Sequence, residues 1–326
     1  MTDTPASFVH LRVHSAYSLS EGALPIKLLA KLSVAQSMPA LGISDTGNLF
    51  GALEFAEVMS GAGVQPIIGC TLLVDTEDTP KGPAHGHTAL DLSRIALIAQ
   101  NEVGYRNLLK LSSRAYLDAP EAELPHITIT VLENLSDGLI CLTAGPNGLI
   151  NKPLLENQRS VAVSRLQRLK SIFGLRLYIE LQRHGLPEER LAETGLVELA
   201  YEMDLPLVAT NEPYFASADD FAAHDALICI AEGEVVANEN RRRLTPDHYF
   251  KSQSEMVSLF ADLPEAIENT IEIARRCSWY PEEIDPILPK FTSGSEASDE
   301  AEELRVQSRL GLANRLDALG LAEGYT

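Results

Sequence analysis

Residues 8–22 read FVHLRVHSAYSLSEG. This stretch begins as a short strand candidate, Phe8–His14, whose carboxyl end carries the ionisable residues Arg12 and His14. Six further runs rich in aliphatic and β-branched residues follow, at Ala40–Ser44, Pro66–Val74, Arg94–Ala99, Gly138–Thr143, Leu175–Leu181 and Leu205–Thr210. Near-continuous apolar runs are typical of strands buried on both faces, as parallel strands are.

Helical patterns separate these runs, so strand and helix alternate along the chain as far as Thr210. Strict alternation indicates a parallel sheet that is either doubly wound or closed into a barrel. Polar or ionisable residues follow most of the runs, and functional sites of β/α barrels are built at that rim. We therefore predict an α/β fold with a seven-stranded β/α barrel.

The pattern changes after residue 231. Two more helices are indicated, one opened by the capping pair Ser252 and Glu255 and one starting at Pro264. A proline-rich and then acidic stretch leads to a final helix near Leu304–Leu319. We expect a barrel domain over residues 1–280, and a linker with the beginning of another, truncated domain over 281–326.

Charge and composition exclude several classes of protein. The 326 residues contain 46 acidic and 26 basic side chains, a formal charge of −20, and 45% are apolar. That mix is typical of a globular protein, and so negative a surface repels phosphate backbones. Four scattered cysteines form no CxxC pair, and there is neither a signal-peptide pattern nor an apolar run long enough to span a membrane. We expect a soluble, cytoplasmic protein.

The opening stretch resembles the first motif of the PHP (polymerase and histidinol phosphatase) domain at the start of bacterial replicative DNA polymerase III alpha subunits. Further motifs resemble that family in order and spacing: LGISDTGNLFGALEF at 41–55, VQPIIGCTLLV at 64–74, LYIELQRHGLPEE at 177–189, LPLVATNEPYF at 205–215 and PEAIENTIEIARRC at 264–277. The resemblance extends from about residue 8 to about residue 291. It implies a distorted seven-stranded barrel followed by the start of a polymerase palm.

Active PHP domains hold three metal ions with His, Asp and Glu ligands and hydrolyse phosphoesters. Several ions close together need converging anionic or imidazole ligands. At the positions that match the motifs this chain keeps His14, Glu21, Asp45, His184 and Glu212, but has Arg12, Thr46, Thr71, Arg94 and Tyr214 where the family has metal ligands. The resemblance therefore implies a degenerate cleft made of these ten residues.

Two guanidiniums beside a metal cluster would add a repulsion of several kcal/mol, which arginine cannot relieve by losing its proton. We therefore predict a cleft with no metal ion and no catalytic residue. As a hypothesis, Arg12 and Arg94 pair with Glu21, Asp45 or Glu212 and supply the positive charge in place of metals.

Other residues leave alternatives open. His14, His184 and Glu212 could bind a single zinc or manganese ion, and His10 could pair with His14, although structural histidines are the favoured interpretation. His85 and His87 are interpreted as part of a solvated loop, and His224-Asp225 as packing residues of a helix. The run Arg241-Arg242-Arg243 is either a patch facing DNA or a neighbouring domain, or a salt-bridged turn.

The resemblance also implies a role. Members of this family synthesise DNA with two magnesium ions held by palm aspartates, which would lie beyond Thr326, so no cofactor is expected within these residues. A degenerate PHP domain is expected to serve as an inactive scaffold that docks the proofreading exonuclease subunit. Other polymerase III holoenzyme subunits are further expected partners, DNA contacts come only through the rest of the full-length chain, and no membrane is involved.

Three alternatives remain. One is an active metal-dependent phosphoesterase in the same cleft, either a 3′–5′ exonuclease or a pyrophosphatase, which needs bound metal. The second is the error-prone paralogue of the same polymerase, which the opening stretch resembles less. The third, a free-standing phosphatase of the family, is disfavoured because the chain continues past the barrel.

Overall fold

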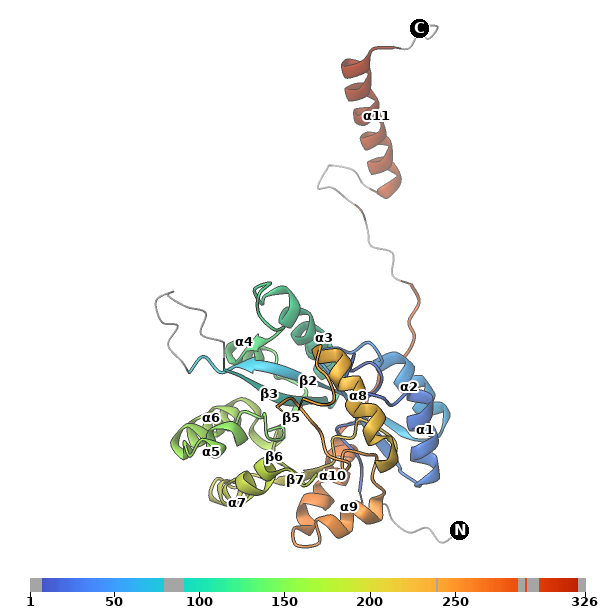
Figure 1. Ribbon diagram of the computed structural model, residues 1–326. Helices are drawn as coiled ribbons and strands as arrows, with labels where there is room; N and C mark the ends of the chain where they lie inside the picture. Colours follow the sequence, from blue (N-terminus) through green and yellow to red (C-terminus); the bar gives the residue numbers. More distant parts are fainter. Residues whose placement is uncertain (1–7, 79–90, 239, 287–290, 292–298, 322–326) are drawn as a thin grey trace. The chain divides into compact units, whose positions relative to one another are not determined.

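The computed structural model describes residues 8–78, 91–238, 240–286, 291 and 299–321 (Figure 1). The chain divides into two compact units, Met1–Glu282 and Glu283–Thr326. The first unit holds a curled mixed sheet with helices packed around it, and the second holds one helix, α11 (Glu300–Leu319). The fold is α/β, as predicted.

The sheet is a single path of six strands with one short branch. The strands are β1 (Ala40–Thr46), β2 (Gln65–Asp75), β3 (Leu92–Ala99), β4 (Ile127–Thr128), β5 (Leu139–Leu142), β6 (Leu177–Gln182) and β7 (Leu207–Thr210). Their order is β1-β2-β3-β5-β6-β7, and β4 pairs with β2 beside this path. β3 is antiparallel to both of its neighbours, whereas the other pairs are parallel. The expectation of an all-parallel sheet was therefore wrong.

The predicted strand Phe8–His14 is extended but is not a regular strand. Its one bridge joins Val13 to Ile43 of β1. The neighbouring backbone groups have partners on other elements: the N–H of Val9 donates to the Thr270 hydroxyl, and the N–H of His14 donates to the Pro213 carbonyl. Because its hydrogen bonds are divided in this way, the segment makes no ladder, but it connects β1 with the chain just beyond β7. The curled sheet is a distorted half-barrel that this segment extends.

The remaining helices surround the sheet (Figure 1). They are α1 (Ile26–Ala35), α2 (Ala52–Gly61), α3 (Glu102–Leu117), α4 (Ile129–Asn134), α5 (Asn151–Leu155), α6 (Arg159–Phe173), α7 (Pro187–Glu202), α8 (Phe221–Glu232), α9 (Gln253–Leu259) and α10 (Pro264–Arg276), with short 3₁₀ turns at Gly174–Arg176 and Ala218–Asp220. The predicted capping pair opens α9, since Ser252 accepts the N–H of Glu255.

The apolar core of the described residues lies wholly between Phe8 and Cys277, in three clusters around the sheet. The strands are buried along almost their whole length, which agrees with their continuous apolar sequences. Within the described part of the chain, every helix is too short or too polar to cross a bilayer.

Candidate functional site

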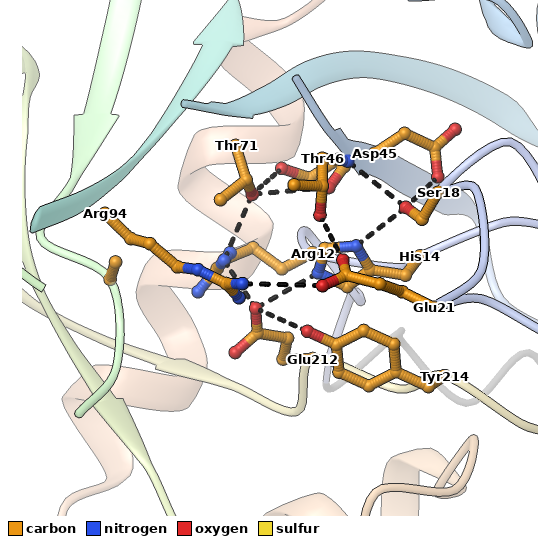
Figure 2. Close-up of polar contacts among 12 residues, drawn as sticks. Arg12, His14, Ser18, Glu21, Asp45, Thr46, Thr71, Arg94, Glu212 and Tyr214 are labelled. Carbon is orange, nitrogen blue, oxygen red and sulfur yellow. Dashed lines mark hydrogen bonds and ion pairs between the residues drawn. The ribbon is translucent and has the colours of Figure 1, made fainter. Parts of the chain in front are cut away.

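A polar cluster fills the centre of the curled sheet (Figure 2). Arg12 and His14 come from the extended segment, Asp45 and Thr46 from the end of β1, and Thr71 from β2. Glu180 projects from β6, and Glu212 and Tyr214 follow β7. Nine of the ten cleft residues predicted from the sequence meet here.

Arg12 is the centre of this cluster. Its guanidinium is fully buried and bridges two carboxylates: Nη1 lies 2.9 Å from Glu180 Oε1 and Nη2 lies 2.7 Å from Glu212 Oε1. Nη2 also donates to the Thr71 hydroxyl at 3.1 Å. A buried charge is costly unless it is paired with an opposite charge and hydrogen-bonded. Arg12 meets both conditions, because its partners lie on β6, just beyond β7 and on β2.

The carboxylates that hold Arg12 are themselves fixed. Gln182 Nε2 donates to Glu180 Oε1 at 2.9 Å and to Glu212 Oε2 at 3.0 Å, so one amide connects the two acids. The N–H of Ala144 donates to Glu180 Oε2 at 3.0 Å. Glu212 has a φ of 45°, in the left-handed region that few residues other than glycine adopt, and strain of this kind persists only where surrounding contacts hold it.

His14 extends the network to β1. Its Nε2 lies 3.0 Å from Glu212 Oε1, its Nδ1 lies 2.9 Å from the Ser18 hydroxyl, and its ring stacks on Tyr214 with centroids 4.3 Å apart. The Ser18 hydroxyl in turn donates to Asp45 Oδ1 at 2.7 Å. Asp45 also accepts from the hydroxyl and N–H of Ser15. Asp45 therefore pairs with serines and with neither Arg12 nor Arg94, contrary to one of the pairings in the sequence hypothesis.

Glu21 forms a second node nearer the surface. Its carboxylate lies 3.5 Å from Arg94 Nη2 and 2.7 Å from Arg242 Nη1, and it accepts the hydroxyl of Thr46 at 2.7 Å. Thus Arg94 pairs with Glu21 and Arg12 with Glu212, as the sequence hypothesis proposed. Arg242 adds a third guanidinium.

The arginines determine how the cleft titrates. Burial alone would raise the pKa of Glu21, but Arg242 and Arg94 outweigh it and lower that pKa to about 2. Burial likewise opposes ionisation of Glu212, yet Arg12 and His14 hold its pKa well below the usual range. Asp45 has no cation in contact, and burial raises its pKa. Glu21 and Glu212 therefore stay ionised in the cleft.

The residues present do not fit a metal cluster. Within the described residues, no group of three or more His, Cys, Asp or Glu side chains is arranged to hold a metal ion. The Arg12 guanidinium lies between Glu180 and Glu212, where a metal ion would need the same carboxylate oxygens. Because arginine stays charged at any relevant pH, a divalent cation would have to displace it.

His184 is the predicted cleft residue that lies elsewhere. Its Nδ1 is 2.7 Å from Glu189 Oε1, its Nε2 contacts the Asn211 carbonyl, and its ring stacks on His248 with centroids 3.9 Å apart. Both ring nitrogens are therefore occupied by protein atoms. The single-ion alternative with His14, His184 and Glu212 does not match this arrangement.

The other sequence candidates also have structural partners. His10 Nε2 contacts the Lys251 carbonyl instead of pairing with His14, and His224 Nε2 contacts the Glu21 carbonyl. Asp225 binds Arg241 through two hydrogen bonds of 2.8 and 2.6 Å. The arginine run is thus a salt-bridged turn at Arg241 and Arg242. His85 and His87 lie outside the described residues.

The cleft predicted from the sequence lacked five contributors, namely Ser15, Ser18, Glu180, Gln182 and Arg242. Glu180 and Gln182 had a detectable signal, because they are polar residues at alternate positions of an otherwise apolar strand, LYIELQ. Alternation puts both on the same face of β6, which is the face toward Arg12. Ser15 and Ser18 had no comparable signal, since both lie outside strands and helices. Arg242 was noticed in the arginine run, but nothing in the sequence connected that run with the cleft.

Comparison with known proteins gives consistent matches. The PHP domain matches residues 10–184. A DNA polymerase III subunit alpha from Caulobacter vibrioides is 47% identical over 97% of this chain and 27% of its own length. The Rickettsia bellii protein of that name is 38% identical over 95% of this chain and 25% of its own. An amidohydrolase structure from Chromobacterium violaceum covers 62% of this chain and 86% of its own, with a TM-score of 0.39 and 11% identity. The chain spans about a quarter of the length of these polymerase relatives.

Proposed function

This chain belongs to the PHP domain family, and from that premise we propose that it is a catalytically inactive, structural PHP domain of a DNA polymerase III alpha subunit. Its relatives from Caulobacter vibrioides and Rickettsia bellii are described as DNA polymerase III subunit alpha, and the matches cover nearly all of this chain. DNA synthesis itself belongs, in this proposal, to parts of the subunit other than residues 1–326.

The observation that carries the proposal is the buried guanidinium of Arg12 between Glu180 and Glu212. Metal-assisted hydrolysis needs a Lewis acid that polarises a phosphoryl oxygen or activates a water molecule. A guanidinium with a raised pKa can do neither, since it is a fixed charge without a vacant coordination position. What it can do is neutralise converging carboxylates and hold their strands together.

Metal binding and hydrolysis test this proposal together. The purified chain is dialysed against manganese and zinc, desalted, and assayed for bound metal and for cleavage of a phosphodiester. We expect less than one ion per chain and no hydrolysis above the level of the matched Glu212→Gln variant, which removes a carboxylate from the cleft. Two or more ions per chain, with hydrolysis that the variant loses, would establish the phosphoesterase alternative instead.

The partner remains the proofreading exonuclease subunit expected from the family resemblance. Two features support a protein partner over DNA: the formal charge of −20 and the inward-facing side chains of Arg241 and Arg242. The setting of this proposal is the cytoplasm, where the replication machinery works. Co-purification of the exonuclease subunit of the same organism with this chain is the expected result, and independent elution of the two at micromolar concentration would reject the docking role.

A further inference from the structure

A hollow lies beside α7, and none of the residues that line it belongs to the Arg12 cluster. It has a volume of about 460 Å³ and is lined by residues of α7 and of the segment that leads into α9. Its lining comprises the basic residues Arg183, Arg190 and Lys251, the acidic residues Glu189, Glu193 and Asp247, and Gly185, Thr194 and Leu259. A volume of this size is within the range of small-molecule sites.

Lys251 is the unusual residue of this hollow. Its side chain is 6% exposed, yet no carboxylate is within hydrogen-bond distance, because Asp247 Oδ1 is 3.9 Å away. The ammonium group instead contacts two neutral oxygens, the Asp247 carbonyl and Asn211 Oδ1, and lies 4.6 Å from the centre of the Tyr249 ring. Burial accordingly lowers the pKa of Lys251. A buried cation without a close counter-ion is costly, and an anion in the hollow would remove that cost.

Arg190 supplies a second cation to the hollow. It is exposed, and its guanidinium has no hydrogen-bond or ion-pair partner among the described residues. Three acids also line the hollow. Glu189 accepts three hydrogen bonds from His184 and Leu186, and Glu193 forms a two-bond pair with Arg183. The third, Asp247, is half-exposed and lies 3.9 Å from the Lys251 ammonium group, so three basic and three acidic side chains face the hollow. In a chain with 46 acidic and 26 basic residues, two under-neutralised cations on one hollow are unexpected.

We propose that this hollow binds a small oxyanion, a phosphate ester or a carboxylate, through Arg190 and Lys251. The Thr194 hydroxyl, which has no hydrogen-bond partner among the described residues, is available to the same ligand, and Leu259 offers an apolar floor for its body. The net charge of the molecule opposes binding only weakly at physiological ionic strength, where charges more than about 8 Å apart are largely screened. This site is independent of the function proposed for the Arg12 cluster.

Titration calorimetry of the whole chain tests the site with three probes, inorganic phosphate, citrate and a tri-glutamate peptide, each matched in ionic strength with chloride. We expect one phosphate or one citrate to bind per chain. The probe that binds more tightly tells whether the ligand is a phosphate ester or a carboxylate. Arg190→Gln should weaken that binding at least about tenfold, the loss of one charge-assisted contact. Arg275→Gln removes an exposed arginine of α10 that likewise has no ion-pair partner in the described part of the chain, and it should leave the binding unchanged.

Lys251→Met keeps the aliphatic stem and should abolish binding. If that variant fails to fold, Thr194→Val, at an exposed position, provides a second test with a smaller expected loss. Absence of heat with phosphate and citrate would overturn the proposal, and so would equal weakening by Arg190→Gln and Arg275→Gln. Binding of the peptide alone would also overturn it, because it would make the hollow a contact for an acidic polypeptide.

Discussion

Arg12 has the geometry of a structural cation. It contacts carboxylates from β6 and from the chain beyond β7, and a hydroxyl from β2, so one side chain joins elements that are far apart in sequence. Replacing a buried ion pair as a whole is often harmless, but removing one partner leaves a buried charge without compensation. The contribution of Arg12 should therefore be most visible when it is removed alone.

Arg12→Met retains most of the side-chain volume and removes the charge. We expect it to lower the free energy of unfolding by about 3–5 kcal/mol, because Glu180 then stays buried without its cation. Denaturant unfolding followed by circular dichroism measures the change. Adding Glu180→Gln to Arg12→Met should restore at least about 1 kcal/mol, since the remaining charge is removed as well.

The exposed pair of Arg106 with Glu102 on α3 provides the control, because exposed pairs contribute little. Arg106→Met should change the free energy of unfolding by less than about 0.5 kcal/mol. A loss of less than about 1 kcal/mol in Arg12→Met would contradict the structural role assigned to this residue.

The lowered pKa of Glu21 predicts how the free energy of unfolding depends on pH. Its pKa in the folded protein is about 2, below the usual value, so the unfolded chain binds the proton more tightly than the folded protein does. The contribution of Glu21 to the free energy of unfolding is therefore complete above the pKa that Glu21 has in the unfolded chain. It disappears as the pH falls from about 5 to about 2, a loss of up to roughly 3 kcal/mol. Glu212 acts in the same direction. Asp45 has a raised pKa and the opposite sign, which offsets part of the effect.

Unfolding midpoints measured across that pH range should fall steeply in the parent chain and less steeply in Glu21→Gln. Glu102→Gln removes an exposed carboxylate on α3 and should leave the steepness unchanged. Parallel curves for the parent and Glu21→Gln would show that the arginines do not depress the pKa of this residue.

At the residue scale, the sequence predicted much of the cluster, and its errors have physical causes. The residues placed by family motifs came together because those motifs mark strand ends on one rim. His184 was misplaced because a motif position does not show which partners a ring takes, and here Glu189 and the Asn211 carbonyl occupy both ring nitrogens. Glu180 was overlooked because an apolar run was interpreted as a whole and not residue by residue.

At the scale of elements, apolar runs located the strands well but not their directions. β3 is antiparallel to β2, and the sequence contained a hint that the prediction of strict alternation overlooked, since the stretch between Val74 and Arg94 has no helical pattern. A parallel crossover usually needs a helix, whereas antiparallel neighbours do not. β4 was missed because two residues are too short to make a periodic signal.

The start of α3 depends on a close backbone contact that can be tested. A Cβ atom at Gly104 would lie 2.0 Å from the Gly138 carbonyl oxygen, at the turn that leads into β5. Gly104→Ala must therefore move the helix away from that turn, and we expect a loss of about 2 kcal/mol or more in the free energy of unfolding. Denaturant titration measures it.

Gly61, at the end of α2, is the matched control because a Cβ there would meet no atom within 4 Å. Gly61→Ala should be neutral or stabilising by up to about 1 kcal/mol, since alanine reduces the freedom of the unfolded chain. Equal effects of the two substitutions would mean that the contact with Gly138 does not fix α3.

At the scale of the whole molecule, charge and its arrangement determine which partners are possible. The chain carries a formal charge of −20, and two members of its strongest basic run face inward, Arg241 toward Asp225 and Arg242 toward Glu21. Arg243 is half-exposed and has only a 3.9 Å contact with Asp225. Binding to DNA without sequence preference depends on several basic groups that contact phosphates together, and this surface leaves few of them available.

We therefore expect residues 1–326 to show no saturable binding to a labelled DNA duplex in fluorescence anisotropy at physiological salt, up to about 100 μM protein, the weak end of non-specific DNA affinities. Arg243→Ala should give the same flat titration. Saturable binding in the micromolar range, weakened by Arg243→Ala, would show that the arginine run contacts phosphates despite the inward ion pairs of Arg241 and Arg242.

Asp225→Asn releases Arg241 from its carboxylate. If this variant binds DNA and the parent does not, then the ion pairs of the arginine run, and not net charge alone, prevent the parent from binding.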